Sequence, residues 1–192
     1  MIIVSGSGRS GTSMIMQTMK IWGLPIAGVP FHSDFPVREL NPKGYWDLPV
    51  DILREGIDMR YKGMVVKLFG GWLSAVDSKH IDKMIVCKRR CVASQDKSMM
   101  NAFDKEAETQ SDSKYRELML KDAPKLNELQ VRRRKNYRDI RKFLNRNKHI
   151  DHTQVYIEDV IDNPEEKLNE IANFIDRDIK NMEKAIENID RR

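Results

Sequence analysis

Apolar and polar residues occur in blocks along the chain, and the apolar blocks predict buried strands. Residues 1–5 and 83–87 are short continuous apolar runs, and residues 63–69 form a third run that ends at two glycines. Runs of this length, bounded by glycines or charged residues, are typical of strands buried on both faces. A fourth short strand is predicted over residues 153–157.

Helical periodicity fills the intervals between these strands. After the first strand, apolar residues recur at i, i+4 and i+7, at Ile15, Met19 and Trp22. Further helices are predicted over residues 48–61, 92–103 and 115–145, and Pro124 either starts a new helix or kinks one.

The last predicted helix carries a clear start signal. Asn163 is a favourable N-cap, Pro164 suits the first helical position, and Glu166 suits the third. A core-facing apolar stripe follows at Leu168, Ile171 and Ile175.

The order of these elements predicts the architecture. Strands separated by helical crossovers pair in parallel, and helices cover both faces of the resulting sheet. We therefore expect one α/β domain over residues 1–192, a three-layer fold with a mostly parallel central sheet flanked by helices. Residues 24–47, rich in Pro and Gly, are expected to form a long loop, residues 104–114 a loop or mobile insert, and residues 115–150 a helical basic segment.

The chain has 192 residues and a formal net charge of +5, but the charge is unevenly distributed. Nine lysines and arginines lie between residues 131 and 148, whereas residues 158–190 are mainly acidic. No apolar run reaches the about 18 residues that cross a bilayer, and the first residues do not suit a signal peptide. The two cysteines, Cys87 and Cys91, lack zinc-ligand spacing and are too few for a disulfide framework. These features predict a cytoplasmic protein with no membrane span and no metal site.

A glycine-rich run lies between the first predicted strand and the first predicted helix. It reads GSGRSGTS over residues 6–13, and Gly6 and Gly11 have the G-x-x-x-x-G spacing of a phosphate-binding P-loop. Backbone N–H groups of such a loop converge at the positive end of the helix dipole, so a phosphate is the expected occupant. A glycine-rich turn that binds nothing is the alternative.

The run departs from an ATP- or GTP-binding P-loop at one position. In those proteins a lysine directly follows the second glycine and reaches the β- and γ-phosphates. Thr12 stands at that position here, and the positive charge lies inside the loop, at Arg9.

This arrangement resembles the nucleotide-binding loop of sulfotransferases that use 3′-phosphoadenosine 5′-phosphosulfate (PAPS), including small bacterial and viral sulfotransferase-like proteins. The resemblance implies that the loop binds the 5′-phosphosulfate end, that Arg9 stabilises the bridging oxygen during sulfuryl transfer, and that no metal is required. The nucleotide-binding residues it implies in the loop are Gly8, Arg9, Ser10, Gly11, Thr12 and Ser13.

The same family has a second nucleotide element, in which an arginine at the end of a strand and a serine about two turns into the next helix reach the 3′-phosphate. Arg90 follows the strand at 83–87, and Ser98 lies eight residues later, which is the usual spacing in the family. We predict this pair, with Arg89 and Ser94 as substitutes. A planar guanidinium can bind two phosphate oxygens at once. A solvated basic turn is the alternative.

Two more segments agree with the resemblance. Residues 155–166, VYIEDVIDNPEE, resemble a strand-turn-helix near the carboxyl end of many sulfotransferases, where the role is mostly structural. Residues 41–47, NPKGYWD, resemble a segment of the small bacterial and viral members. Tyr45 and Trp46 in this segment either line an acceptor site or cover the core.

Sulfuryl transfer requires a base for the acceptor's proton and a group that stabilises the leaving phosphate oxygen. Many family members carry a histidine two residues after a strand lysine; Lys67 matches that lysine, but Phe69 replaces the histidine. The loop after the first helix offers His32, Asp34 and Glu39 instead. His32 is the first choice because the unperturbed pKa of histidine lies nearest neutrality. A surface histidine without a catalytic role is the alternative.

Together these signals predict a sulfotransferase that moves a sulfuryl group from PAPS to a hydroxyl or amine of a small-molecule or glycan acceptor, leaving PAP (adenosine 3′,5′-bisphosphate). A P-loop nucleotide or nucleoside kinase is one alternative, although Thr12 counts against it. A homologue that binds nucleotide without turnover is another, because the family histidine is missing. Nucleic-acid binding by the basic segment is disfavoured, because that segment contains no recognisable nucleic-acid motif.

Overall fold

A five-stranded sheet forms the centre of the computed structural model, which describes residues 1–30, 41, 43–108 and 124–189. The strand order is β2-β3-β1-β4-β5, and every pairing between these strands is parallel. This confirms the predicted α/β fold with a mostly parallel central sheet. The strands are β1 (Ile2–Gly6), β2 (Ile26–Ala27), β3 (Val65–Phe69), β4 (Lys83–Lys88) and β5 (Asp151–Tyr156).

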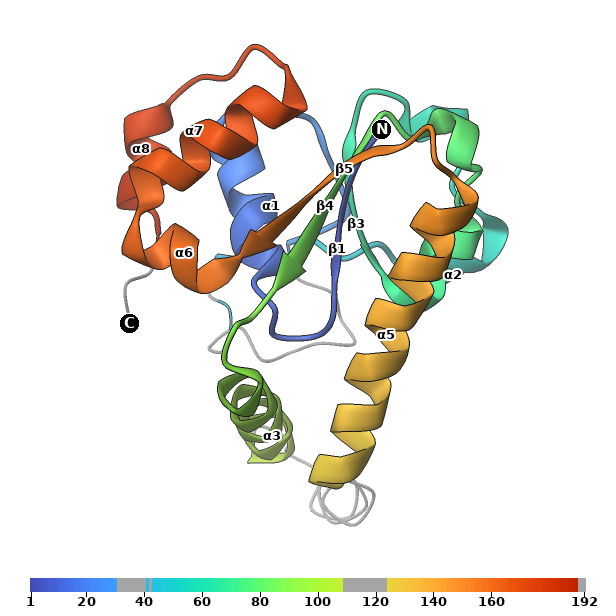
Figure 1. Cartoon of the computed structure of the whole chain (residues 1–192), viewed down its shortest axis with the longest axis vertical. Helices are drawn as coiled ribbons and strands as arrows, with labels where there is room; N and C mark the ends of the chain where they lie inside the picture. Colours follow the sequence, from blue (N-terminus) through green and yellow to red (C-terminus); the bar gives the residue numbers. More distant parts are fainter. Residues whose placement is uncertain (31–40, 42, 109–123, 190–192) are drawn as a thin grey trace.

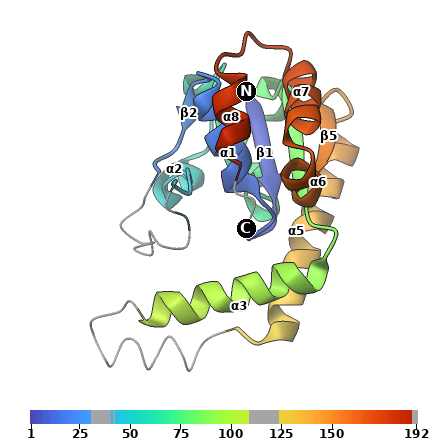
Figure 2. The ribbon, with the colours of Figure 1, turned by 90° about the vertical axis from the view of Figure 1, so that its left-hand side faces the viewer.

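Helices cover both faces of this sheet and give three layers (Figure 1). One layer contains α1 (Thr12–Ile21), α6 (Ile157–Asp162), α7 (Pro164–Ile175) and α8 (Met182–Glu187). The other contains α2 (Val50–Glu55) and α5 (Leu126–Arg146), with the 3-10 helices η2 (Met59–Tyr61), η3 (Gly70–Ala75) and η4 (Ser78–His80) along the chain between α2 and β4. The helix α3 (Val92–Glu108) lies beyond the carboxyl ends of the strands (Figure 2).

Alternation along each strand divides the core between the two faces. Ile2 and Val4 of β1 pack with α1 and the C-terminal helices, whereas Ile3 packs on the opposite side with Ile140 of α5. Successive strand residues point to opposite faces, so a continuous apolar run serves both layers. This is the physical reason why the apolar runs predicted these strands.

Several predicted boundaries were wrong, for local reasons. The helix predicted over 48–61 ends at Glu55, because Gly56 adopts a positive φ of 98°. The loop predicted from residue 104 begins as helix, since α3 continues to Glu108 through residues that favour helix and need no apolar face. The strand β2 lies inside the predicted long loop 24–47.

Helical segments near the C-terminus also differ from the prediction. The helices α6 and α8 have six residues each, too few to show a period, and were not predicted. Asn163 and Pro164 do begin α7, but the Asn163 side chain makes no capping hydrogen bond. Residues 109–114 of the predicted insert and residues 115–123 of the predicted helix lie outside the described residues. Within the described part of the chain, no helix is long and apolar enough to span a membrane.

Candidate functional site

The glycine-rich loop connects β1 to α1 at the carboxyl edge of the sheet. Gly11 caps α1 with a positive φ of 91°, and a Cβ there would lie 2.5 Å from the Ile157 side chain. A Cβ on Gly8 would lie 2.2 Å from the end of Met99 on α3. The loop backbone is thus packed closely between α6 and α3. The ten-residue helix α1 begins directly after the loop, at Thr12. Such a helix start favours an anion.

Arg9 lies within this loop with a positive φ of 60°. Its Nε donates a hydrogen bond to Oγ of Ser98 on α3, at 3.0 Å. Burial lowers the pKa of the Arg9 guanidinium; the nearby Tyr45 opposes this shift, and the positive charge of Arg89 adds to it. The guanidinium still remains protonated at neutral pH. Two cations from separate elements therefore face one region, where an anion would relieve their repulsion.

The basic turn after β4 directs its two arginines differently. Arg90 forms a bidentate ion pair with Asp159 of α6, at 2.9 and 2.6 Å, and lies 4.3 Å from the Tyr156 ring. Arg89 instead donates from Nη1 to Oγ of Ser94 at 3.3 Å, and its buried Nε has no hydrogen-bond partner among the described residues. Of the two predicted arginines, the substitute, Arg89, is the one close enough to Arg9 to affect its pKa.

Lys67 on β3 carries a third cation to the start of α1. Its side chain is only 2% exposed, and its Nζ donates to Oγ of Ser13 at 3.1 Å and to the Tyr45 carbonyl at 2.7 Å. It also forms an ion pair with Asp47 at 2.9 Å. Burial lowers the pKa of Lys67, and Asp47 opposes that shift. A lysine from the neighbouring strand thus supplies a positive charge near the place where Thr12 replaces the P-loop lysine.

The segment 41–47 joins this cluster through its backbone. The Gly44 carbonyl accepts hydrogen bonds from Asn41 at 2.8 Å and from Gln17 of α1 at 2.9 Å. Trp46 has a positive φ of 59° and packs against the core beside α1. For Trp46, this favours the core-covering alternative.

Two residues that the sequence did not predict, one on α3 and one on α5, hydrogen-bond the backbone of the loop and of the adjacent strand β4. Gln95 of α3 is buried and donates from Nε2 to the Gly8 carbonyl at 2.7 Å. Tyr137 of α5 donates from its hydroxyl to the Cys87 carbonyl at 3.0 Å. No sequence pattern marks either contact, because each depends on how a distant helix packs.

The three predicted candidates for the base, His32, Asp34 and Glu39, lie outside the described residues. A carboxylate that was not proposed as a base, Asp47, lies beside Lys67 and is 26% exposed. The described residues contain no group of three or more histidines, cysteines or carboxylates arranged to hold a metal ion.

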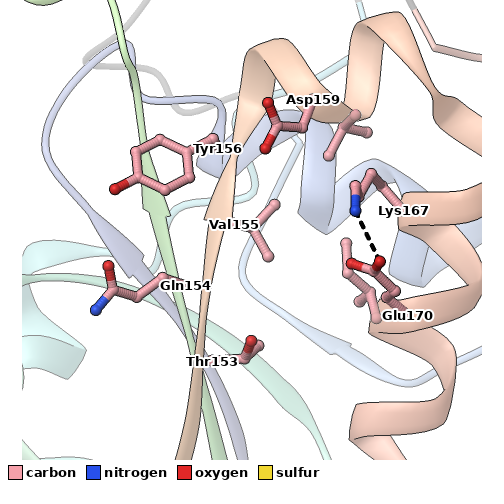
Figure 3. Close-up of a pocket in the computed structure, with 9 residues that line it drawn as sticks. Thr153, Gln154, Val155, Tyr156, Asp159, Lys167 and Glu170 are labelled. Carbon is pink, nitrogen blue, oxygen red and sulfur yellow. Dashed lines mark hydrogen bonds and ion pairs between the residues drawn. The ribbon is translucent and has the colours of Figure 1, made fainter.

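A separate pocket lies between β5, α6 and α7 (Figure 3). Its volume is about 80 Å³, and Lys167 and Glu170 form an ion pair of 2.7 Å at its wall. Nucleotide-sized ligands need about 300 Å³ or more. This pocket therefore does not compete with the loop as the nucleotide site.

Comparisons with known proteins support the fold but identify no sequence family. No family model matches the chain, and no curated protein matches it significantly. Among solved structures, it is similar to retinol dehydratase in complex with androsterone and the inactive cofactor PAP, with a TM-score of 0.53. The chain shares its fold with a PAP-binding protein. At 14% sequence identity, the match covers 98% of this chain and 64% of the other, so the chain spans less than two thirds of that protein's length.

Proposed function

We propose that this protein is a sulfotransferase that transfers a sulfuryl group from PAPS to a hydroxyl or amine of a small-molecule or glycan acceptor. The observation that carries the proposal is the convergence of Arg9, Arg89 and Lys67 on the loop at the start of α1. The PAP bound by the structural neighbour adds support, because PAP is the nucleotide that remains after PAPS gives up its sulfuryl group.

The described residues fit such a nucleotide. The loop N–H groups and Arg9 would hold the 5′-phosphosulfate end, and the enclosed Lys67 would add positive charge from behind the loop. Positive charge there also stabilises a leaving phosphate oxygen. Arg89, whose buried Nε lacks a partner among the described residues, would bind the 3′-phosphate with Ser94 or Ser98. Arg90 is the alternative, but it would have to exchange Asp159 for the phosphate. When bound, PAPS supplies the sulfuryl group, and the protein supplies the positive charge and a base.

Asp47 joins His32, Asp34 and Glu39 as a candidate for that base. Its carboxylate is partly exposed beside the loop cations, whereas Lys67 is fully enclosed. A carboxylate in this place could accept a proton from an acceptor hydroxyl. A test is Asp47→Asn, which keeps the side-chain shape: we expect transfer to fall by about 100-fold or more while PAP binding changes by less than that.

Titration calorimetry with PAP, ADP and ATP, each with and without Mg²⁺, tests the proposal. We expect PAP to bind without metal and more tightly than ADP, because the 3′-phosphate gains Arg89. Tighter binding of ATP with Mg²⁺ would instead favour the kinase alternative. Binding of PAP without transfer to any acceptor would favour the non-catalytic homologue, an alternative that Phe69 in place of the family histidine supports.

A matched pair of variants tests which of the two arginines, Arg89 or Arg90, binds the 3′-phosphate. Arg89→Gln is expected to weaken PAP binding by about tenfold or more and to leave ADP binding nearly unchanged. Arg90→Gln removes the same charge one residue away and should have a smaller effect on PAP. A larger loss of PAP affinity in Arg90→Gln than in Arg89→Gln would show that Arg90 binds the 3′-phosphate.

A further inference from the structure

A second cavity, which the proposed transfer does not use, lies between α5 and the β4–β5 edge of the sheet. Its volume is about 530 Å³, within the range of about 300–1,000 Å³ typical of small-molecule sites. Figure 1 shows α5 running along this side of the sheet, opposite α1. We call this cavity the α5 groove; its basic lining residues are Arg133, Arg134, Arg138 and Arg141 of α5 and Lys148 just after the helix, with Lys88 and His152 across from them.

The α5 side of the groove is a straight row of positive charge. Positions 134, 138 and 141 are separated by four and three residues, so they share one face of the helix. Arg134, Arg138 and Arg141 are exposed and make no ion pair or hydrogen bond with the other described residues. Such a row repels itself unless an anion lies along it.

No carboxylate among the described residues lines the groove to neutralise this row. Figure 3 shows why on the β5 side: Gln154 points away from Lys167 and Glu170, which lie on the other side of the strand. Alternation along β5 places His152 on the same side as Gln154. The acidic C-terminal helices therefore leave the groove charge uncompensated.

The base of the groove is apolar. Val86 of β4 and Ile140 of α5 are buried there, and the Tyr137 ring lies 5.9 Å from Nζ of Lys88. An apolar base below a polar rim is the usual construction of a site for an organic molecule rather than for an inorganic ion alone.

The groove is separate from the nucleotide loop. Neither Arg9 nor Ser98 lines it, nor does any residue of the run 6–13. The two regions adjoin at the end of β4, where Lys88 lines the groove and Arg89 turns toward the loop, and at Tyr137, which lines the groove and lies close to Ser7 and Ser10 of the loop. Because no loop residue lines the groove, both sites can be filled at once.

We propose that the α5 groove binds a small organic anion carrying two or more phosphate or sulfate groups. Arginines one helical turn apart have Cβ atoms about 5–6 Å from each other, so each neighbouring pair can clamp one tetrahedral group through planar guanidinium forks. The ring or chain that joins these groups would rest on Tyr137 and Ile140. A single-stranded nucleic acid fits less well, because Tyr137 and His152 are the only two rings among the described lining residues, and such sites stack successive bases on several rings.

Titration of the full chain with inositol hexakisphosphate and, separately, inositol hexakissulfate tests this proposal and distinguishes the two kinds of anionic group. We expect at least one of them to bind at physiological ionic strength, with the same affinity in the presence of saturating PAP. The double variant Arg138→Gln/Arg141→Gln should weaken that binding by about tenfold or more. The Gln154→Glu variant, which places a carboxylate in the groove, should also weaken it.

The matched control is Arg132→Gln/Arg146→Gln, which removes the same charge from exposed positions of α5 that do not line the groove. An equal loss in this control would show a non-specific response to net charge and would overturn the proposal. Competition by PAP would place the anion in the nucleotide site instead. Binding of heparin or poly(U) without binding of either inositol derivative would replace the proposed site with a macromolecular surface.

Discussion

A positive charge that a P-loop usually takes from its own helix comes here from a neighbouring strand. The register of β1 against β3 pairs Val4 with Lys67, which places the Lys67 side chain on the α1 face of the sheet. Its ammonium then reaches Ser13, one residue beyond Thr12. The strand pairing therefore restores a cation that the local sequence lacks, and a search for the P-loop lysine alone would miss it.

Burial of Lys67 has a consequence for stability at high pH. Because its folded-state pKa lies below the ordinary 10.5, the unfolded chain binds more protons in the window between these two values. Unfolding free energy should therefore rise with pH across that window. We expect the stability of the wild type relative to Lys67→Met to increase between neutral pH and about pH 10. Urea unfolding of both proteins at each pH measures this, and a constant difference would contradict it.

The two thiols should differ sharply in reactivity. Burial raises the pKa of Cys87 to about 12, whereas Cys91 is exposed. Thiolate is the reactive form, so one thiol per chain should react with a disulfide reagent in the native protein and the second only after unfolding. Mass spectrometry of the labelled peptides identifies each one. Early labelling of Cys87 would contradict the structure.

At the scale of elements, the two helices next to the loop are joined by a buried ion pair. Asp96 of α3 and Arg133 of α5 contact each other, with side chains only 7% and 11% exposed. Gln95, the residue before Asp96, hydrogen-bonds the Gly8 carbonyl. The pairing of α3 with α5 therefore helps to set the position of the loop backbone.

Removing only one partner of this ion pair should lower the unfolding free energy substantially. Arg133→Met leaves the Asp96 carboxylate buried without a partner, and we expect a loss of about 3–5 kcal/mol of unfolding free energy. The double variant Asp96→Leu/Arg133→Met removes both charges and should recover most of that loss. Denaturant unfolding of Arg133→Met, Asp96→Leu and the double variant measures the coupling. A loss in the double variant equal to the sum of the two single losses would show that the charges do not interact.

The sequence predicted long elements better than short ones. The strands β1, β3 and β4 were predicted from apolar runs, because burial on both faces requires such runs. The strand β2 has two residues and α6 has six, so neither is long enough to show a period. The site shows the same limit: Arg89 and Arg90 are adjacent in sequence, and only the position of Asp159 on α6 shows which of them is already paired.

At the scale of the whole molecule, the proposed nucleotide site collects charge from three separate elements. Arg9 comes from the loop after β1, Lys67 from β3 and Arg89 from the end of β4. A nucleotide bound by Arg9 and Arg89, with the Lys67 charge behind the loop, would link the carboxyl ends of the central strands. Because only the folded chain brings these cations together, such a ligand should stabilise the entire fold.

Thermal unfolding should show this linkage. PAP at a concentration about 100 times its Kd contributes about 2.7 kcal/mol, which corresponds to a rise in Tm of about 5–11 °C for a chain of this size. ADP at the same concentration should give a smaller rise. An unchanged Tm with PAP would argue against the nucleotide site. The Arg9→Ala variant serves as the control, and its shift with PAP should be reduced.

The left-handed backbone of Arg9 lowers the stability of the fold, whereas its side chain is needed for the proposed activity. A residue with a Cβ at a positive φ costs about 1–2 kcal/mol that glycine would avoid, and Arg9 adopts a φ of 60°. Laboratory evolution for heat resistance alone would therefore favour glycine at position 9 and discard the guanidinium in the loop. Selection for turnover would retain arginine. Variants recovered under these two pressures should diverge first at this residue.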